Sequence, residues 1–523
     1  MTGESKNNLY ASLGPAPTPL CPQRWPGADH EAEKTLLWSL KDNHEKWHLY
    51  FNDKGFHNHA THHLLAKYAL GASGPLINAV YDAEASYQRP AIKSPEPVKE
   101  QNFVNHLGKE EYYSGYLEFF TSILLEKGIP ATLEEFIFSN KYNYDPQVKD
   151  DDEQPRMLSR FLSGVLHPWI HTGYGVEFDL IGQTAEGLAQ TAVHRAGGDK
   201  AVPLSRFQTP PSGLASSAVS RLTSALPSLS LNSTGQSAQT TGETAFSVLS
   251  RLLADPMCII ASMGPTAGKS PVEMESIVAA LIKKAFERCG DIVRKAAEEW
   301  LPLDGPEPSE ATLNHKMEEI IWMNVALYAI CGWTDAKQFN ADFFLMHLVT
   351  SALFLPSLLA PSVLPMSSRR HLLQAYFSIC VSTWISRGRP ALAIRDFMAR
   401  TDAHITPPGV KPDPHKDALP HDDKKLQVNA NAWLPIVQTT LVHPDEHLCK
   451  TQRALAHFAV LYGDRPKEYW KNEGAHNLDG LEELDGTLFA RAAALTANRL
   501  GWMVEGEEKG HWDFDGFFGD ESA

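Results

Sequence analysis

Residues 56–72 read FHNHATHHLLAKYALGA, and this stretch joins four histidines to the start of a helix. His59 and His63 lie four residues apart, and the apolar residues after them recur at helical spacing until Gly71. Side chains four residues apart share one face of a helix, which is how many helical metal sites are built. The stretch therefore predicts a helix that carries imidazole rings into the protein interior.

The same histidine spacing returns in HPWIH, residues 167–171, at the end of an apolar segment that begins near Arg156. We expect Pro168 to kink this predicted helix or to open a new first turn. His194 ends the apolar-faced stretch EGLAQTAVH, and His347 lies within FFLMHLVTSALFL. A buried imidazole needs a hydrogen-bond partner or a metal ion. If these segments converge, they form a nitrogen-rich metal site; the alternative is a set of structural histidines bonded to carbonyls and helix ends.

Helical periodicity dominates the chain, which has 523 residues, of which 43% are hydrophobic and 21% are charged. Neither strand-like alternation nor a βαβ rhythm is visible. We therefore predict a mainly α, multi-helical protein with its helices packed around a buried His-rich site. The predicted organisation is a flexible N-terminal arm (1–30), a first helical catalytic region (31–196), a low-complexity insertion (197–243), a second helical core region (244–403), a loop insertion (404–430) and a C-terminal helical region of the same domain (431–523).

The composition argues against several classes of protein. A formal net charge of −16 without a long Lys/Arg run indicates that nucleic acid is not a partner. Six scattered cysteines without a CxxC motif favour reduced thiols, and the N-terminus lacks an apolar signal core, so we predict a cytoplasmic protein. The most apolar stretch, residues 343–365, contains three prolines, which favours a buried helix over stable membrane insertion. The oligomeric state stays open.

Short motifs add three alternatives. HEKWH, residues 44–48, matches the HExxH pattern of zinc hydrolases, but its polar surroundings favour an exposed helix face. GPTAGKS, residues 264–270, is one residue short of a phosphate-binding loop. HPDEH, residues 443–447, offers a second histidine pair, although the acids between the rings favour a helix cap with ion pairs. The chain has no GxGxxG motif, so a conventional nicotinamide or flavin domain is not expected.

Six longer stretches carry a family resemblance: HPWIHTGYGVEF, EGLAQTAVH, GFHNHATHHLLAKYALGA, ADFFLMHLVTSALFLP, LPIVQTTLVHPDEHLCKTQRALAHFA and DGTLFARAAALTANRLGW. Together they resemble the questin oxidase-like family of fungal secondary metabolism, over about residues 35–503. The resemblance implies an oxygenase that opens the quinone ring of an anthraquinone-type polyketide. It also implies a Baeyer–Villiger-type oxidation with O2, with NADPH as the expected reductant.

Ring-opening oxygenation needs a group that activates dioxygen, and a clustered imidazole site for Fe(II) would supply it. The carboxylate that commonly completes such a site is predicted to be Glu177 or Glu186. Two further readings stay open: an NADPH-dependent oxidase without bound metal, and a non-catalytic helical binder of aromatic pigments. The predicted site comprises metal ligands His63, His167, His171 and His347, catalytic residues His59, His194 and Tyr174, and substrate-stacking residues Trp169 and Phe344.

Overall fold

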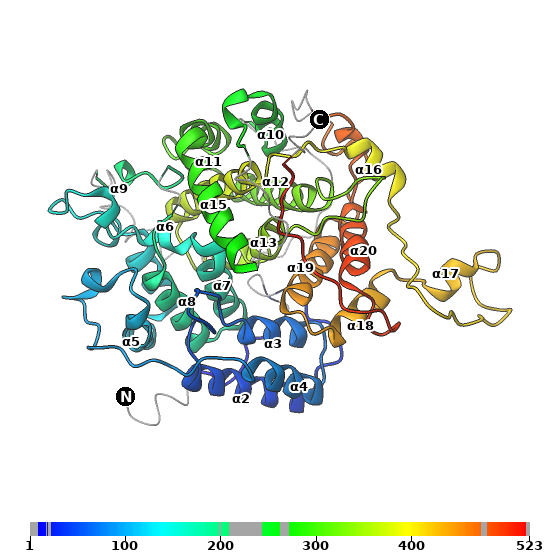
Figure 1. The fold of residues 1–523 in the computed structure, drawn as a ribbon, viewed down its shortest axis with the longest axis horizontal. Helices are drawn as coiled ribbons and strands as arrows, with labels where there is room; N and C mark the ends of the chain where they lie inside the picture. The colour runs from blue at the N-terminus through cyan, green and yellow to red at the C-terminus, as the bar shows by residue number, and fades with distance from the viewer. Residues whose placement is uncertain are drawn as a thin grey trace.

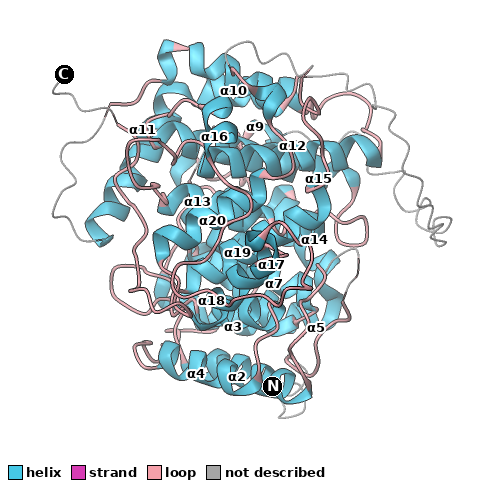
Figure 2. Ribbon diagram, turned by 90° about the vertical axis from the view of Figure 1, so that its right-hand side faces the viewer, coloured by secondary structure: helices cyan, strands magenta, loops and turns pink. Residues whose placement is uncertain are grey.

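The structure, a computed structural model, describes residues 9–16, 18, 22–197, 200–208, 243–261, 271–471 and 478–518. Across these residues the regular elements are helices and none is a strand (Figure 2). The predicted mainly α class is therefore confirmed. Most of the predicted insertion over 197–243 lies outside the described residues, as does the GPTAGKS motif.

The N-terminal helices build the lower part of the molecule in Figure 1, where α2, α3 and α4 pack on one another. Next to them α7 packs on α8, and α8 packs on α5. The bounds of this first group are α2 His30–Lys46, α3 Ala60–Ala69, α4 Gly74–Ala85, α5 Tyr113–Leu133, α6 Met157–Phe161, α7 His167–Phe178, α8 Ile181–Val193 and α9 Ser205–Gln208.

The C-terminal helices complete the body from above and from the right in Figure 1. In this group α11 packs on α15, α12 packs on α13, and α19 packs on α20. The bounds are α10 Ala245–Ala254, α11 Pro271–Trp300, α12 Glu310–Ala329, α13 Phe343–Ala352, α14 Leu355–Leu358, α15 Met366–Ser386, α16 Ile394–Arg400, α17 Lys424–Val428, α18 Trp433–Val442, α19 Glu446–Tyr462 and α20 Leu488–Leu500.

The two groups meet at α3, α7, α13 and α19. Helix α19 contacts both α3 and α13, and α7 contacts both α3 and α13. Buried apolar side chains form one continuous core that extends from Leu9 to Trp512. Helices that are distant in sequence therefore bring their histidines to one interior region.

The segment that we expected to be one helix from Arg156 to His171 is broken. Helix α6 ends at Phe161, and a 3-10 turn over Gly164–Leu166 separates it from α7. Val165 and Leu166 have φ angles of 53° and 64°, a left-handed conformation that a helix cannot contain. Pro168 lies in the first turn of α7, where its missing N–H costs no hydrogen bond.

The apolar stretch over residues 343–365 folds as the buried helix α13, followed by the short helix α14. Asp342 caps α13 by accepting hydrogen bonds from the backbone N–H groups of Phe344 and Leu345. Among the described residues, no helix combines the length and apolar character that crossing a bilayer requires. The cysteines among the described residues form no disulfide bonds and are buried.

Candidate metal centre and its surroundings

Three buried histidines form the centre of the candidate site. His59 directly precedes α3, His167 begins α7, and His447 lies in the first turn of α19. One ligand nitrogen from each ring lies within 4.8 Å of the other two. His59 Nε2 and His167 Nε2 are 2.8 Å apart, and the ring centroids of His59 and His447 are 4.6 Å apart. This spacing lets the three rings share one small ion.

His347 from α13 lies on the border of this trio. Its ring centroid is 5.1 Å from that of His167 and 5.2 Å from that of His447. Its Nδ1 lies 2.7 Å from the carbonyl oxygen of Phe343, and only a protonated nitrogen can bond there. In the neutral ring, Nε2 of His347 is therefore unprotonated and carries the lone pair. This atom is buried without a hydrogen-bond partner among the described residues.

In His167 and His447, as in His347, Nδ1 lies close to an oxygen atom. His167 Nδ1 lies 2.6 Å from the carbonyl oxygen of Gly164, which again leaves Nε2 as the lone pair. His447 Nδ1 lies 3.2 Å from Glu446 Oε1, and its buried Nε2 has no partner among the described residues. Second nitrogens that are held by carbonyls or carboxylates are typical of metal-binding histidines.

The electrostatic surroundings keep these rings neutral. Burial, followed by the positive charge of Lys450, lowers the pKa of His59 and of His447 well below the usual range. Burial and neighbouring histidines have the same effect on the pKa of His167 and of His347. Neutral imidazole is the form that binds metal, so the cluster is ready for a cation at neutral pH.

Further imidazoles extend the cluster on one side. His57 stacks on His167, with ring centroids 3.9 Å apart and an angle of 4° between the planes. His57 Nε2 also lies 2.8 Å from the Nε2 atom of the predicted catalytic residue His194. Burial, followed by the charge of Arg160, lowers the pKa of His194 to about 4.

The remaining predicted ligands, His63 and His171, have other partners. His63 Nδ1 lies 2.8 Å from Glu84 Oε1, and burial with the nearby charge of Glu446 raises the pKa of Glu84 to about 8. His171 Nε2 lies 2.8 Å from Glu186 Oε2. The structure thus brings His167 and His347 together with His59, while His63 and His171 lie in adjoining hydrogen-bonded pairs.

The predicted carboxylates are placed differently from Glu446. Glu177 pairs with Arg453, and Glu186 bonds to His171 and to His44. Glu446 Oε1, in contrast, lies 3.7 Å from His59 Nδ1 as well as near His447. Among the carboxylates named, Glu446 is the one that contacts the central trio.

Three predicted aromatic residues are packed inside the core. Tyr174 stacks on His62 with centroids 5.2 Å apart. Trp169 stacks on Tyr376, and its indole N–H donates to the Ser351 carbonyl at 2.9 Å. Phe344 lies beneath the guanidinium of Arg387. Trp169 and Phe344 line neither the cleft between α2 and α5 nor the small pocket next to it.

His447 is the central residue that the sequence reasoning did not select. Asp445 does cap α19, because it accepts hydrogen bonds from the backbone N–H groups of His447 and Leu448. The expected cap is therefore present, while the ring of His447 turns inward to the cluster. The four-residue spacing of His443 and His447 was the available signal.

The two histidines of HEKWH point to different partners. His44 Nδ1 lies 2.6 Å from Glu186 Oε1, whereas His48 Nε2 lies 3.0 Å from Glu110 Oε1. Among the described residues, no potential metal group contains both rings. This geometry does not support a zinc hydrolase built on HEKWH.

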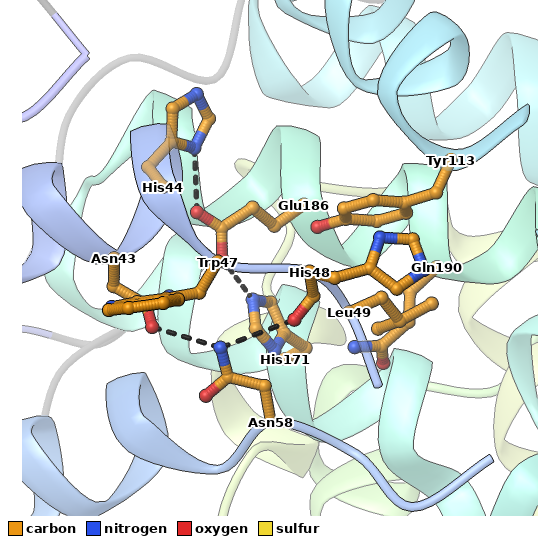
Figure 3. Close-up of a pocket in the computed structure, with 10 residues that line it drawn as sticks. All are labelled: Asn43, His44, Trp47, His48, Leu49, Asn58, Tyr113, His171, Glu186 and Gln190. Atoms are coloured by element: carbon orange, nitrogen blue, oxygen red, sulfur yellow. Dashed lines mark hydrogen bonds and ion pairs between the residues drawn. The ribbon is translucent and has the colours of Figure 1, made fainter. Parts of the chain in front are cut away.

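A cleft of about 720 Å³ opens between α2 and α5. It shares His44, Trp47, His48 and Tyr113 with a small inner pocket, which reaches His171, Glu186 and Gln190. Figure 3 shows this inner pocket, with Glu186 between His44 and His171. The cleft therefore leads from the surface towards the buried histidines.

Two known proteins resemble this chain over most of its length, and a third resembles about a third of it. Oxidoreductase AflY of Aspergillus parasiticus is 27% identical over 429 residues, which cover 80% of this chain and 70% of that protein. Baeyer-Villiger oxidase GME11358 of Pestalotiopsis microspora is 26% identical over 374 residues, which cover 70% of this chain and 73% of that protein. Questin oxidase of Aspergillus terreus is 30% identical over 167 residues, which cover 31% of this chain and 35% of that protein.

A family profile described as Questin oxidase-like matches residues 56–455. The matched region includes His59, His167, His347 and His447, and it ends within α19. The chain therefore belongs to the questin oxidase-like family, as its sequence resemblance predicted.

Proposed function

We propose that this oxidoreductase uses O2 and a histidine-bound Fe(II) ion to open the ring of an anthraquinone-type polyketide. Family membership supports the coarser part of the proposal, an oxidase of fungal secondary metabolism. The observation that carries the finer part is the gathering of His59, His167 and His447 ligand atoms within 4.8 Å.

The residues fit a metal ion. We assign His59, His167 and His447 as ligands, with His347 beside them as a fourth. The buried Nε2 atoms of His347 and His447 have no hydrogen-bond partner among the described residues, and a cation would satisfy both. Iron, when bound, supplies the one-electron chemistry that the reaction of dioxygen with an organic molecule requires.

The chain's own residues prepare this site. The carbonyls of Gly164 and Phe343 fix the tautomers of His167 and His347, so both rings aim their Nε2 lone pairs without a reorganisation cost. Burial excludes bulk water, which protects reactive oxygen species from side reactions. Glu446 holds the second nitrogen of His447 and lies near that of His59.

A Baeyer–Villiger oxidation fixes where the two oxygen atoms of O2 go and how many electrons the reaction needs. One oxygen atom enters between the carbonyl carbon and its neighbour to give a ring-expanded lactone, and the other leaves as water after taking two electrons and two protons. Water then hydrolyses the ester bond of the lactone, which opens the ring to an acid and a hydroxyl group. NADPH is the reductant that we propose. Relatives named Baeyer-Villiger oxidase and Baeyer-Villiger monooxygenase support this reaction class.

The experiment combines metal analysis with oxygen uptake. Protein purified without chelator should contain about one iron per chain, and it should consume O2 only with an anthraquinone-type substrate and NADPH. Dialysis against a chelator should abolish the uptake, and Fe(II) should restore it. Full activity in metal-free protein would contradict the proposal and favour an NADPH-dependent oxidase without metal.

A further inference from the structure

A row of hydrogen-bonded side chains runs from the cleft towards the histidine cluster, and Figure 3 shows its first three members, His44, Glu186 and His171. His44 Nδ1 lies 2.6 Å from Glu186 Oε1, and Glu186 Oε2 lies 2.8 Å from His171 Nε2. His171 Nδ1 in turn lies 3.0 Å from His62 Nε2. The ring centroid of His62 is 5.7 Å from that of His59, so the row ends beside a proposed ligand.

Of the four side chains in this row, only His44 lines the outer cleft, whereas Glu186 and His171 line only the inner pocket. The His44 side chain is 12% exposed and lines both the cleft and the inner pocket. Glu186, His171 and His62 are buried. The hydroxyl of Tyr10, which also lines the cleft, donates to Glu186 at 2.7 Å. Solvent protons can therefore reach the row at His44, or at Glu186 through the Tyr10 hydroxyl, and not at His62.

The chemistry of the row suits proton transfer. Burial opposes the ionisation of Glu186, but hydrogen bonds from His171 and His44 hold the pKa of its carboxyl down to about 2. Glu186 is therefore a carboxylate at rest, which can take a proton from an imidazolium on one side, form the neutral acid briefly, and give a proton to the imidazole on the other side. His62 Nδ1 is buried without a partner among the described residues, so it can give or take a proton at the inner end.

We propose that His44, Glu186, His171 and His62 form a proton relay between the cleft and the histidine cluster. The inference rests on the proposed function, because reduction of one oxygen atom to water consumes two protons in a buried site. In each transfer, the bond from hydrogen to the donor atom breaks as a bond to the next acceptor forms, and each imidazole is left in its other tautomer. No electrons change hands, and water in the cleft resupplies His44.

The HEKWH motif supplies a matched control. His48 lines the same two cavities as His44, but its Nε2 bonds to Glu110, away from the row. A replacement of His48 changes the walls of the cleft without interrupting the chain of hydrogen bonds. His44 and His48 can therefore be compared directly.

The first test is chemical rescue. His44→Gly leaves a gap beside the cleft that free imidazole can fill. We expect kcat to fall by about tenfold or more, the usual scale for losing a proton-transfer group, with KM and iron content unchanged. Added imidazole should restore most of the lost rate, with the wild-type enzyme at the same imidazole concentration as the reference. His48→Gly should show no such rescue.

The second test needs neither metal nor turnover. NMR spectra of the metal-free protein, with its histidines labelled with ¹⁵N, report the exchange of the His171 ring proton with water. His44→Phe should slow this exchange about tenfold or more, while His48→Phe should leave it near the wild-type rate. This measurement also covers the case in which His44→Gly fails to fold.

The outcomes separate the two proposals. A wild-type protein that binds no iron and consumes no O2 contradicts the proposed function, while the exchange measurement still decides whether the row conducts protons. If the wild-type enzyme is active, either of two results overturns the relay. One is full kcat in folded His44→Gly, and the other is an equal exchange rate in His44→Phe and His48→Phe.

Discussion

At the scale of single residues, the ring nitrogen that does not face the proposed metal matters as much for the site as the nitrogen that does. His167 and His347 both use Nδ1 to bond a carbonyl oxygen, which leaves Nε2 free for a cation. The sequence identified both of these rings as ligand candidates because they sit in apolar surroundings. The sequence also offered His447 through its four-residue spacing from His443, but the acids between the two rings favoured a helix cap, and the cap and an inward-facing ring are both present.

Replacing His447 should remove metal from the protein. We expect His447→Ala to lower the affinity for Fe(II) by about 100-fold or more, because loss of even an outer partner of a metal ligand costs 10- to 100-fold. Iron per chain after gel filtration, together with a metal titration, measures the effect. His457→Ala changes another histidine of α19, whose ring neighbours Phe458, and should keep the wild-type iron content. Equal iron in the two variants would remove His447 from the site.

Gly164 is a second residue with a sharp expected effect. A Cβ atom at this position would lie 2.3 Å from His194 Cε1, and the backbone has a φ of 54°. The His194 ring cannot yield easily, because it is partly buried and its Nε2 lies 2.8 Å from His57 Nε2. We expect Gly164→Ala to lower the free energy of unfolding by about 1–3 kcal/mol, as measured by urea denaturation.

Gly197 provides the comparison for Gly164. A Cβ atom there would meet only Ser163 Cβ, at 3.9 Å, which is an ordinary contact distance. Gly197→Ala should therefore change the free energy of unfolding by no more than about 0.5 kcal/mol. Similar losses in both variants would show that the approach of Gly164 to His194 is not tight.

At the scale of elements, the periodicity of the sequence predicts helices well and their interruptions poorly. The apolar repeat after His63 correctly predicted α3, and the prolines in 343–365 correctly argued against a span. Pro168 correctly predicted a new first turn at the start of α7. The left-handed residues before it were not predicted, because Val165 and Leu166 have no local tendency to adopt left-handed backbone. Tertiary packing imposes that conformation on them.

Lys67 joins two helices that are far apart in sequence. Its buried Nζ donates to the carbonyl oxygens of Thr440, Leu441 and His443 at the end of α18. Lys67→Met should lower the free energy of unfolding by about 3 kcal/mol, because it leaves buried carbonyls without their charged donor. Lys93→Met, at an exposed position, should change it by less than about 0.5 kcal/mol. Urea denaturation of both variants tests this link, and equal stabilities would contradict it.

At the scale of the whole molecule, the convergence of the histidines is the feature that sequence patterns cannot supply. Spacing shows that two rings share a helix face, but it does not show which helices meet. Hence the sequence supplied His59, His167 and His347 as candidates, and it also supplied His63 and His171, which have carboxylate partners in the fold. The full ligand set stays a prediction until metal is measured.

The many buried histidines should also govern stability in acid. Burial, followed by the charge of Arg206, lowers the pKa of His371 to about 4, whereas an unfolded histidine titrates near 6.5. Between these two values the unfolded chain binds more protons than the folded chain, so stability falls as the pH falls through this window.

The contribution of His371 can be isolated. In His371→Leu, unfolding at pH 5 should take up about one proton fewer than in the wild type, which lowers the slope of stability against pH by up to about 1.4 kcal/mol per unit. Urea denaturation between pH 7 and pH 4.5, in the presence of a chelator, measures the slope. His415→Leu, at a side chain that is 74% exposed, should keep the wild-type slope. An unchanged slope in His371→Leu would refute the assignment.

The order of the four cluster helices along the chain has a consequence for biosynthesis. His59, His167 and His347 leave the ribosome before His447, which lies near the start of α19. A nascent polypeptide therefore lacks one wall of the cluster until α19 has emerged from the ribosome. The proposed cation can meet all four rings only after that point, and a prematurely terminated product that ends before α19 would have no complete pocket to fill.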